Sequence, residues 1–435
     1  MRTIGLLFMP AEPEAALVAG GLSLVERQVR QLRRAGADRI LITGMQPLAV
    51  LPAGAEPVSL TQLDASVADD DRVIVLARGL IVDERALTAI FAAPVPTLMV
   101  SDATRLEAQG VERLDALTFA AGVAAIGGAQ VRRAARALGD WDLESTLIRL
   151  LAEDSTVARL EWTGLAEYAP ARRRNVALIW SRPQSEAEAA ALNDALIAAA
   201  QKGCLDWPAR FLHPPIENLL VRLLAPTRIT PDMVTLATGL IGVAAAVAFA
   251  AGWLWTGLVL ALITGPLDGV DGKLARTRVE FSRFGDLEHL LDKALEYGWY
   301  LCAAGYFAAT LQSYLPWACA ALIILPALSE AVQGEFFRRF TGIQLDDAGP
   351  VERGIRIVAG RRNTFLWTWL PFAAFGYWFE GVVVLACYSV VTTGLAQWRF
   401  YHRVAAFGRA HSATIDGNFR ATGYHFLPSR IVSSK

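Results

Sequence analysis

The sequence predicts two parts of different fold class: an α/β domain with a mostly parallel, doubly wound sheet, followed by an all-α, polytopic membrane domain. Strand-like and helix-like segments alternate through the first half. The chain is 54% hydrophobic and 19% charged, and its long apolar runs are concentrated after about residue 230. A run of acids inside that apolar half indicates a functional site, because carboxylates beside a membrane are costly to desolvate.

The elements of the first half follow from local signals. A strand is expected at Thr3–Met9 and a helix at Leu24–Ala35, where Ser23 and Glu26 form a capping box and Gly36 ends the helix. Further strands are expected at Arg39–Thr43, Arg72–Ala77, Pro96–Val100 and Thr118–Ile126, with helices at about 84–92, 128–138 and 142–153.

Six apolar stretches of the second half are candidates for transmembrane helices. They cover roughly 233–252, 256–275, 288–310, 315–336, 365–379 and 381–400. With a cytoplasmic amino terminus, the outer loops Gly252–Gly257, Gln312–Pro316 and Tyr377–Glu380 contain no Lys or Arg, whereas the inner connections are rich in arginine. The positive-inside rule therefore predicts a multi-pass protein of the cytoplasmic (inner) membrane, with the first domain on the cytoplasmic side.

These patterns predict four regions along the chain. Residues 1–180 form the α/β domain, 181–231 a linker with an interfacial juxtamembrane helix, 232–408 the membrane domain and 409–435 a cytoplasmic tail. Apolar residues and two arginines over 205–224 fit a helix on the membrane surface, broken by Pro214 and Pro215, although a simple linker helix explains them equally well. No secretory signal is expected, and a net charge of −1 gives no reason to expect a nucleic-acid partner.

The acids lie on two consecutive predicted helices. Positions Asp268, Asp271, Gly272 and Ala275 follow an i, i+3, i+4, i+7 pattern and share one helix face, and Glu288 and Asp292 form an i, i+4 pair on the next helix. The two small residues leave room for a ligand to approach the backbone. Oxygen donors without a cluster of His or Cys suit a hard divalent ion, Mg²⁺ or Mn²⁺, that carries substrate phosphates.

This segment resembles the signature of the CDP-alcohol phosphatidyltransferase family, D-x2-D-G-x2-A-R-x8-G-x3-D-x3-D. The matching residues are Asp268, Asp271, Gly272, Ala275, Arg276 and Gly285. At strict spacing the third and fourth family aspartates fall on His289 and Lys293. Removing one residue after Gly285 places Glu288 and Asp292 there instead, and we favour this register; the alternative is a degenerate, inactive site.

The resemblance implies a reaction and a role for each matching residue. A phosphoalcohol or phosphatidyl group would pass from a CDP-alcohol to the hydroxyl of a lipid or polyol-phosphate acceptor, with release of CMP. The implied metal ligands are Asp268, Asp271, Glu288 and Asp292, with Asp292 also the general base, and the implied substrate-binding residues are Gly272, Ala275, Arg276, Gly285, Arg361 and Arg362. The family resemblance also implies that the protein forms a homodimer and contacts membrane lipids.

The first half resembles sugar-nucleotide and inositol-phosphate nucleotidyltransferases, which implies a Rossmann-like fold. Its own chemistry is expected to be lost, because Glu12 and Glu14 replace the basic residue after the first strand and Arg78 stands where a metal-binding Asp is expected. Asp83 and Asp102 are expected to be solvated loop acids. The fusion resembles bifunctional proteins that make CDP-inositol and then transfer inositol phosphate, and this likeness extends through Lys202-Gly203, Asp206-Trp207 and Arg228–Thr235.

Two function classes follow from the sequence. The first is a metal-dependent membrane transferase that uses a CDP-alcohol. The second is a catalytically inactive scaffold or regulator derived from such an enzyme. The intact Asp268 and Asp271 favour the transferase, whereas a proton relay in a transporter would not explain the small residues on the same face.

Overall fold

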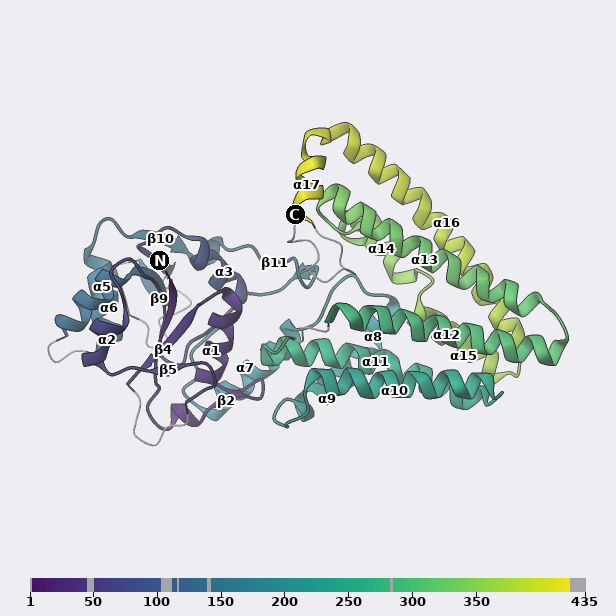
Figure 1. The fold of residues 1–435 in the computed structure, drawn as a ribbon, viewed down its shortest axis with the longest axis horizontal. Helices are drawn as coiled ribbons and strands as arrows, with labels where there is room; N and C mark the ends of the chain where they lie inside the picture. Colours follow the sequence, from purple (N-terminus) through teal and green to yellow (C-terminus); the bar gives the residue numbers. More distant parts are fainter. Residues whose placement is uncertain are drawn as a thin grey trace.

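A computed structural model describes residues 2–44, 51–102, 112–115, 117–138, 142–281 and 285–422, and the side chains of 285–291 lie outside this description. The described chain forms an α/β region built around one sheet and a helical region of long, roughly aligned helices (Figure 1). The α/β character of the first half and the helical character of the second are therefore as predicted. A detailed nucleotidyltransferase fold stays a prediction.

The main sheet has seven strands in the order β10-β8-β9-β6-β1-β4-β5. Strand β1 pairs in parallel with both β4 and β6, whereas β9 runs antiparallel between β6 and β8. The sheet is thus mostly parallel with one reversed strand. The strands are β1 (Thr3–Phe8), β4 (Arg39–Thr43), β5 (Glu56–Pro57), β6 (Arg72–Leu76), β8 (Thr97–Asp102), β9 (Thr118–Gly127) and β10 (Ala158–Glu161).

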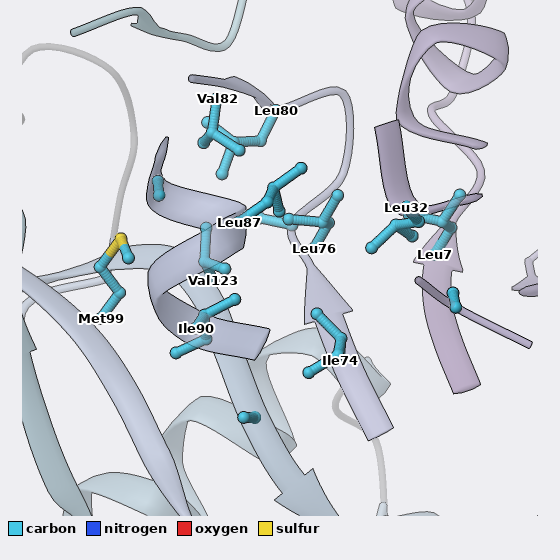
Figure 2. Close-up of a cluster of buried hydrophobic side chains, with 14 of the residues drawn as sticks. Leu7, Leu32, Ile74, Leu76, Leu80, Val82, Leu87, Ile90, Met99 and Val123 are labelled. Carbon is cyan, nitrogen blue, oxygen red and sulfur yellow. The ribbon is translucent and has the colours of Figure 1, made fainter. Parts of the chain in front are cut away.

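Helices cover both faces of this sheet, because successive residues of a buried strand point to opposite sides. In β1, Leu7 joins the core under α1 (Leu24–Ala35) and α3 (Glu84–Ala92), which Figure 2 shows. Its neighbours Leu6 and Phe8 join the opposite core. That second core is covered by α2 (Leu60–Ser66), α5 (Gly128–Arg136) and α6 (Leu143–Glu153).

The predicted cap of α1 is confirmed in part. The Ser23 side chain accepts a hydrogen bond from the backbone N–H of Glu26, and Gly36 ends the helix with a φ of 111°. The Glu26 carboxylate accepts a hydrogen bond from Arg30 at 2.7 Å. The acid therefore supports the helix through an i, i+4 ion pair.

A helix lies at each of the six predicted spans. They are α10 (Pro231–Ala250), α11 (Leu254–Arg278), α12 (Gly285–Leu311), α13 (Leu315–Thr341), α15 (Arg362–Ala374) and α16 (Trp378–Ala410). Within the described residues, four of them, α10, α11, α13 and α16, are long and apolar enough to cross a membrane. With 13 residues, α15 is shorter than the roughly 20 needed to span a bilayer. Six spans therefore stay a prediction.

The predicted surface helix consists of two helices, α8 (Trp207–Phe211) and α9 (His213–Leu224). Pro214 and Pro215 lie in the first turn of α9, directly after the break at Leu212, so the predicted interruption at these prolines is confirmed. Proline is excluded from a helix interior but fits a first turn, which needs no intrahelical N–H donor. Leu219 and Leu223 of α9 are exposed one turn apart, whereas Glu217 and Val221 are buried.

Shorter elements complete the described chain. They are η1 (Glu14–Ala16), β2 (Val18–Ala19), β3 (Leu22–Ser23), β7 (Ile81–Val82), η3 (Trp162–Gly164), β11 (Tyr168–Ala169), β12 (Arg174–Asn175), β13 (Trp180–Ser181), α7 (Glu186–Ala199), η4 (Leu345–Asp347), α14 (Pro350–Val358), η5 (Ser412–Thr414) and α17 (Ile415–Ala421).

Candidate functional site

A cavity of about 730 Å³ lies where α11, α12 and α15 meet the linker and α9. Both helices of the acidic motif contribute to its wall. The predicted site residues among its lining are Asp268, Asp271, Gly272, Ala275, Arg276, Asp292, Arg361 and Arg362. Gly285 is the first residue of α12, and the side chain of Glu288 lies outside the described residues.

Arg362 joins the two acidic helices. Its Nη2 donates a hydrogen bond to Oδ2 of Asp268 at 2.5 Å, and its Nη1 lies 3.8 Å from Oδ1 of Asp292. The arginine offsets the repulsion between these acids. Arg362, which was expected to hold a substrate phosphate, thus contacts the two acids in this structure.

Asp271 is held by a neighbour that the sequence did not single out as a site residue. The side chain is buried, and its Oδ2 accepts a hydrogen bond from Oγ1 of Thr235 in α10 at 2.8 Å. Its Oδ1 accepts one from the backbone N–H of Gly272. Thr235 closes the Thr-Pro-Asp-Met-Val-Thr stretch at the start of α10, which was the only local signal for it.

Cationic side chains form another part of the wall. Lys202, Arg173, Arg276, Arg356 and Arg361 all line the cavity. Burial lowers the pKa of Lys202, while the acids Asp268 and Asp271 oppose that shift. The Nε of Arg276 donates to the carbonyl oxygen of Ala200 at 2.6 Å, so the motif helix is fixed to the chain just before Lys202.

The linker contributes a buried ion pair that sequence reasoning missed. The Nζ of Lys273, inside the motif, lies 2.8 Å from Oε2 of Glu217 in α9, with the side chains 1% and 5% exposed. Asn218 accepts a second hydrogen bond from Lys273. Gly269 makes room for this pair, since a Cβ there would lie 2.2 Å from Oε1 of Glu217. His213 of α9 is also buried at the cavity wall.

The register of the second half of the motif is described only in part. Asp292 lines the cavity, as the favoured register requires. Lys293 lines it too, but its ammonium lies 2.8 Å from Glu296 and its side chain is 42% exposed. The side chains of Glu288 and His289 are outside the described residues, so the register stays a prediction.

The donor chemistry of the cavity fits a hard divalent ion. Asp268, Asp271 and Asp292 are oxygen donors lining one cavity, and neither Cys nor a pair of His joins them there. Among the side chains that the structure describes, no three acids, histidines or cysteines are close enough together to hold an ion. A fourth expected ligand, Glu288, lies outside that set.

The first domain has its own buried acid beside Arg78. The backbone N–H of Arg78 donates to Glu144, and the Nε of Arg78 lies 3.9 Å from Oε2 of that residue. Burial raises the pKa of Glu144.

The expectation that Asp83 is a solvated acid is wrong: it is buried, and it caps α3 and pairs with Arg85 at 2.7 Å. Asp102 is exposed, as expected, but it is the last residue of strand β8 and not a loop residue. Loss of nucleotidyltransferase activity stays a prediction.

Comparison with known proteins supports the resemblance. The chain is 28% identical over 210 residues to the bifunctional IPC transferase and DIPP synthase of Aquifex aeolicus (47% of each chain). It is 38% identical over 133 residues to the inner membrane protein YnjF of Escherichia coli (26% of this chain and 63% of the relative). A bifunctional IPC transferase and DIPP synthase from Thermococcus kodakarensis is 28% identical over 170 residues, which cover 39% of this chain and 38% of the relative.

The aligned part of the chain thus spans about half the length of the curated relatives it matches. Helices able to span a bilayer and the likeness to an inner membrane protein together support a membrane location. Residues 228–385 match the family model of CDP-alcohol phosphatidyltransferases. This segment contains Thr235, the acids of α11 and α12, and Arg362. The chain therefore carries a CDP-alcohol phosphatidyltransferase domain over residues 228–385.

Proposed function

We propose that the protein is a membrane transferase that moves a phosphoalcohol, or a phosphatidyl group, from a CDP-linked donor to a hydroxyl acceptor and releases CMP. One observation carries the proposal: Asp268 and Asp271 of α11 and Asp292 of α12 line a single 730 Å³ cavity that also has a cationic wall. Acids suit a metal and a proton acceptor, and cations suit the phosphates of both substrates.

The proposed metal is Mg²⁺ or Mn²⁺, with Asp268, Asp271, Glu288 and Asp292 as its ligands. When bound, the ion would neutralise charge on the pyrophosphate of the donor. Thr235 would keep the Asp271 carboxylate oriented towards the cavity, since it donates to one of its oxygens. Because Gly272 and Ala275 have small side chains, the donor could approach the backbone of α11 at this part of the cavity wall.

The cationic wall would hold the phosphates. Lys202 is half-buried, and within the described residues it has no hydrogen-bond or ion-pair partner, so its ammonium is available to a phosphate oxygen. Arg276 and Arg361 extend this surface. Arg362 is assigned a positioning role, since it holds Asp268 and Asp292 together.

Asp292 is the proposed general base. The hydroxyl oxygen of the acceptor attacks the phosphorus that carries the alcohol, the bond from that phosphorus to the CMP oxygen breaks, and the hydroxyl proton passes to the Asp292 carboxylate. Arg362 lies 3.8 Å from this carboxylate and holds it beside Asp268 at the cavity wall. CMP leaves with the electron pair of the broken bond.

The test is CMP release by the purified protein with a panel of CDP-alcohols, including CDP-inositol, CDP-glycerol and CDP-diacylglycerol. We expect Asp268→Asn and Asp271→Asn to abolish release without unfolding the protein, and EDTA to do so reversibly. Asp292→Asn should lower turnover by about 10²–10⁴-fold. Lys293→Ala is the matched control, since its charge is paired with Glu296. Full activity of Asp271→Asn would refute the assignment, and inactivity towards the whole panel would favour the scaffold.

We propose three further properties of the protein. The arginine-rich inner connections support a cytoplasmic active site. The family resemblance supports a homodimer surrounded by lipid. Residues 1–180 alone should release no pyrophosphate from CTP with any alcohol phosphate. The reason is that Arg78, which contacts Glu144, stands where a metal-binding acid is expected.

A further inference from the structure

The first domain is docked on the carboxyl end of the motif helix. In α1, Arg27 donates to the carbonyl oxygen of Thr277, and Nη1 of Arg30 donates to that of Arg278 at 3.1 Å. These carbonyls belong to the last turn of α11, where no intrahelical N–H is left to pair with them. One helix of the α/β region thus caps the helix that carries Asp268 and Asp271 (Figure 1).

A second cavity, of about 230 Å³, lies at this junction. A cavity needs only about 10–15 Å³ to hold one water molecule, so this one is large enough for a small organic ligand. Arg27, Gln31 and Arg172 contribute from the first domain, and Arg276 and Phe281 contribute from the end of α11 and beyond. Arg276 and Phe281 also line the larger cavity, so the two cavities share a wall.

The charges around the junction cavity are unbalanced. Its lining carries four arginines, Arg27, Arg34, Arg172 and Arg276, against the two acids Asp83 and Glu84. The acids are already paired: Asp83 with Arg85, and Glu84 with Arg172 at 3.1 Å and with Arg34 at 4.0 Å.

Two of these guanidinium groups are left without a carboxylate. Within the described residues, Arg27 and Arg276 form no ion pair and donate only to backbone carbonyls. Arg27 is 1% exposed, and burial lowers its pKa to about 10. Buried charges are normally paired, because desolvating an isolated one is costly. An anion in this cavity would supply the missing charge.

Two unpaired polar atoms define the ligand further. Nη1 of Arg172 is a buried donor without an acceptor in the described part of the chain. Oε1 of Gln31 is a buried acceptor without a donor there, while Nε2 of the same side chain donates to the carbonyl of Val82 at 2.7 Å. The Gln31 side chain is only 9% exposed. Both residues line the cavity, so a complementary ligand offers an anionic oxygen to the Arg172 guanidinium and a hydroxyl or amino hydrogen to the Gln31 amide.

We propose that the junction cavity is a second binding site, for a small phosphate ester that also carries hydroxyl groups. The site adjoins the proposed transferase centre, with which it shares Arg276 and Phe281, and it would tie the first domain to α11 through Arg276. It gives the first domain a ligand-binding role that does not require nucleotidyltransferase chemistry. Two sources share this chemistry: a nucleoside monophosphate such as CMP, and a polyol phosphate such as glycerol 3-phosphate.

The experiment is calorimetric titration of the full-length protein in detergent with CMP, glycerol 3-phosphate and inorganic phosphate. It uses Asp268→Asn and Asp292→Asn backgrounds, so that the transferase centre is altered independently. We expect saturable binding in both backgrounds. Arg172→Gln and Gln31→Leu should each weaken it by about tenfold or more, since each removes a buried hydrogen bond to the ligand. Tighter binding of CMP or of glycerol 3-phosphate would identify the source.

Arg30→Gln is the matched control, because Arg30 contacts the same end of α11 but does not line the cavity. Binding that survives this change and falls in the Arg172 and Gln31 variants supports the proposal. Equal weakening by Arg30→Gln would show that only domain docking matters and would overturn it. The absence of saturable binding of all three probes would also overturn the proposal, because the cavity would then hold only water.

Discussion

Replacing Lys273 with methionine should destabilise the membrane half strongly, although Lys273 is not one of the proposed catalytic groups. Its ammonium lies 2.8 Å from Glu217 and donates to Asn218 at the same distance, and this contact joins α11 to α9. Methionine has a similar length and no charge. The change therefore leaves the Glu217 carboxylate, 5% exposed, without its counter-charge in the wall of the larger cavity.

The magnitude follows from burial. Removing one partner of a buried ion pair costs about 3–5 kcal/mol, because the remaining charge stays desolvated. Burial already raises the pKa of Glu217, and Lys273 opposes that rise. Without Lys273 the carboxyl group should bind a proton more readily in the folded than in the unfolded protein. The loss of stability should then be largest at alkaline pH and should shrink as the pH falls through this raised pKa.

Equilibrium unfolding in a detergent–denaturant series, followed by tryptophan fluorescence, measures the effect. Arg222→Met is the matched control: Arg222 also belongs to α9 and lies 2.9 Å from Asp194, but this pair is 52% and 57% exposed and should contribute about 0–1 kcal/mol. The double variant Lys273→Met with Glu217→Gln should recover part of the loss. If Lys273→Met were no more destabilising than Arg222→Met, the buried-pair argument would be wrong.

Three other predictions follow from single contacts. Hydrogen bonds from two arginines of α16 lower the pKa of Glu352 from 4.5 to about 2. The contribution of Glu352 to stability should therefore be complete above pH 4.5 and lost as the pH falls towards 2. Glu352→Gln should flatten that part of a curve of unfolding free energy against pH. Gly21→Ala should loosen domain docking, measured as faster proteolysis of the linker, because φ is +75° and a Cβ would lie 1.8 Å from the carbonyl oxygen of Ala225. Gly36→Ala, with φ +111° but no close backbone contact, should leave cleavage unchanged. Lys202→Met should raise the KM for the CDP-linked donor by about tenfold or more, with partial rescue by Lys202→Arg; an unchanged KM would remove Lys202 from the phosphate site.

Much of the local structure could be predicted from the sequence, because it depends on neighbours in the chain. The 3.6-residue period places Asp268, Asp271 and Gly272 on one helix face, and all three line one cavity. Ser23 and Gly36 bound α1 as expected, since a cap needs only adjacent residues. The break predicted at Pro214 and Pro215 is confirmed at Leu212, because proline is favoured in the first turn of a helix and excluded from its interior.

The sequence by itself determined the two fold classes and the acidic face of α11. Only the tertiary structure decided what that face meets. Arg362 reaches Asp268 from 94 residues further along the chain, and Thr235 reaches Asp271 from 36 residues before it. The Lys273–Glu217 pair and the junction cavity likewise depend on packing between distant segments. Periodicity fixes which side chains share a face, but the partner of that face is chosen by the long-range packing that buries it.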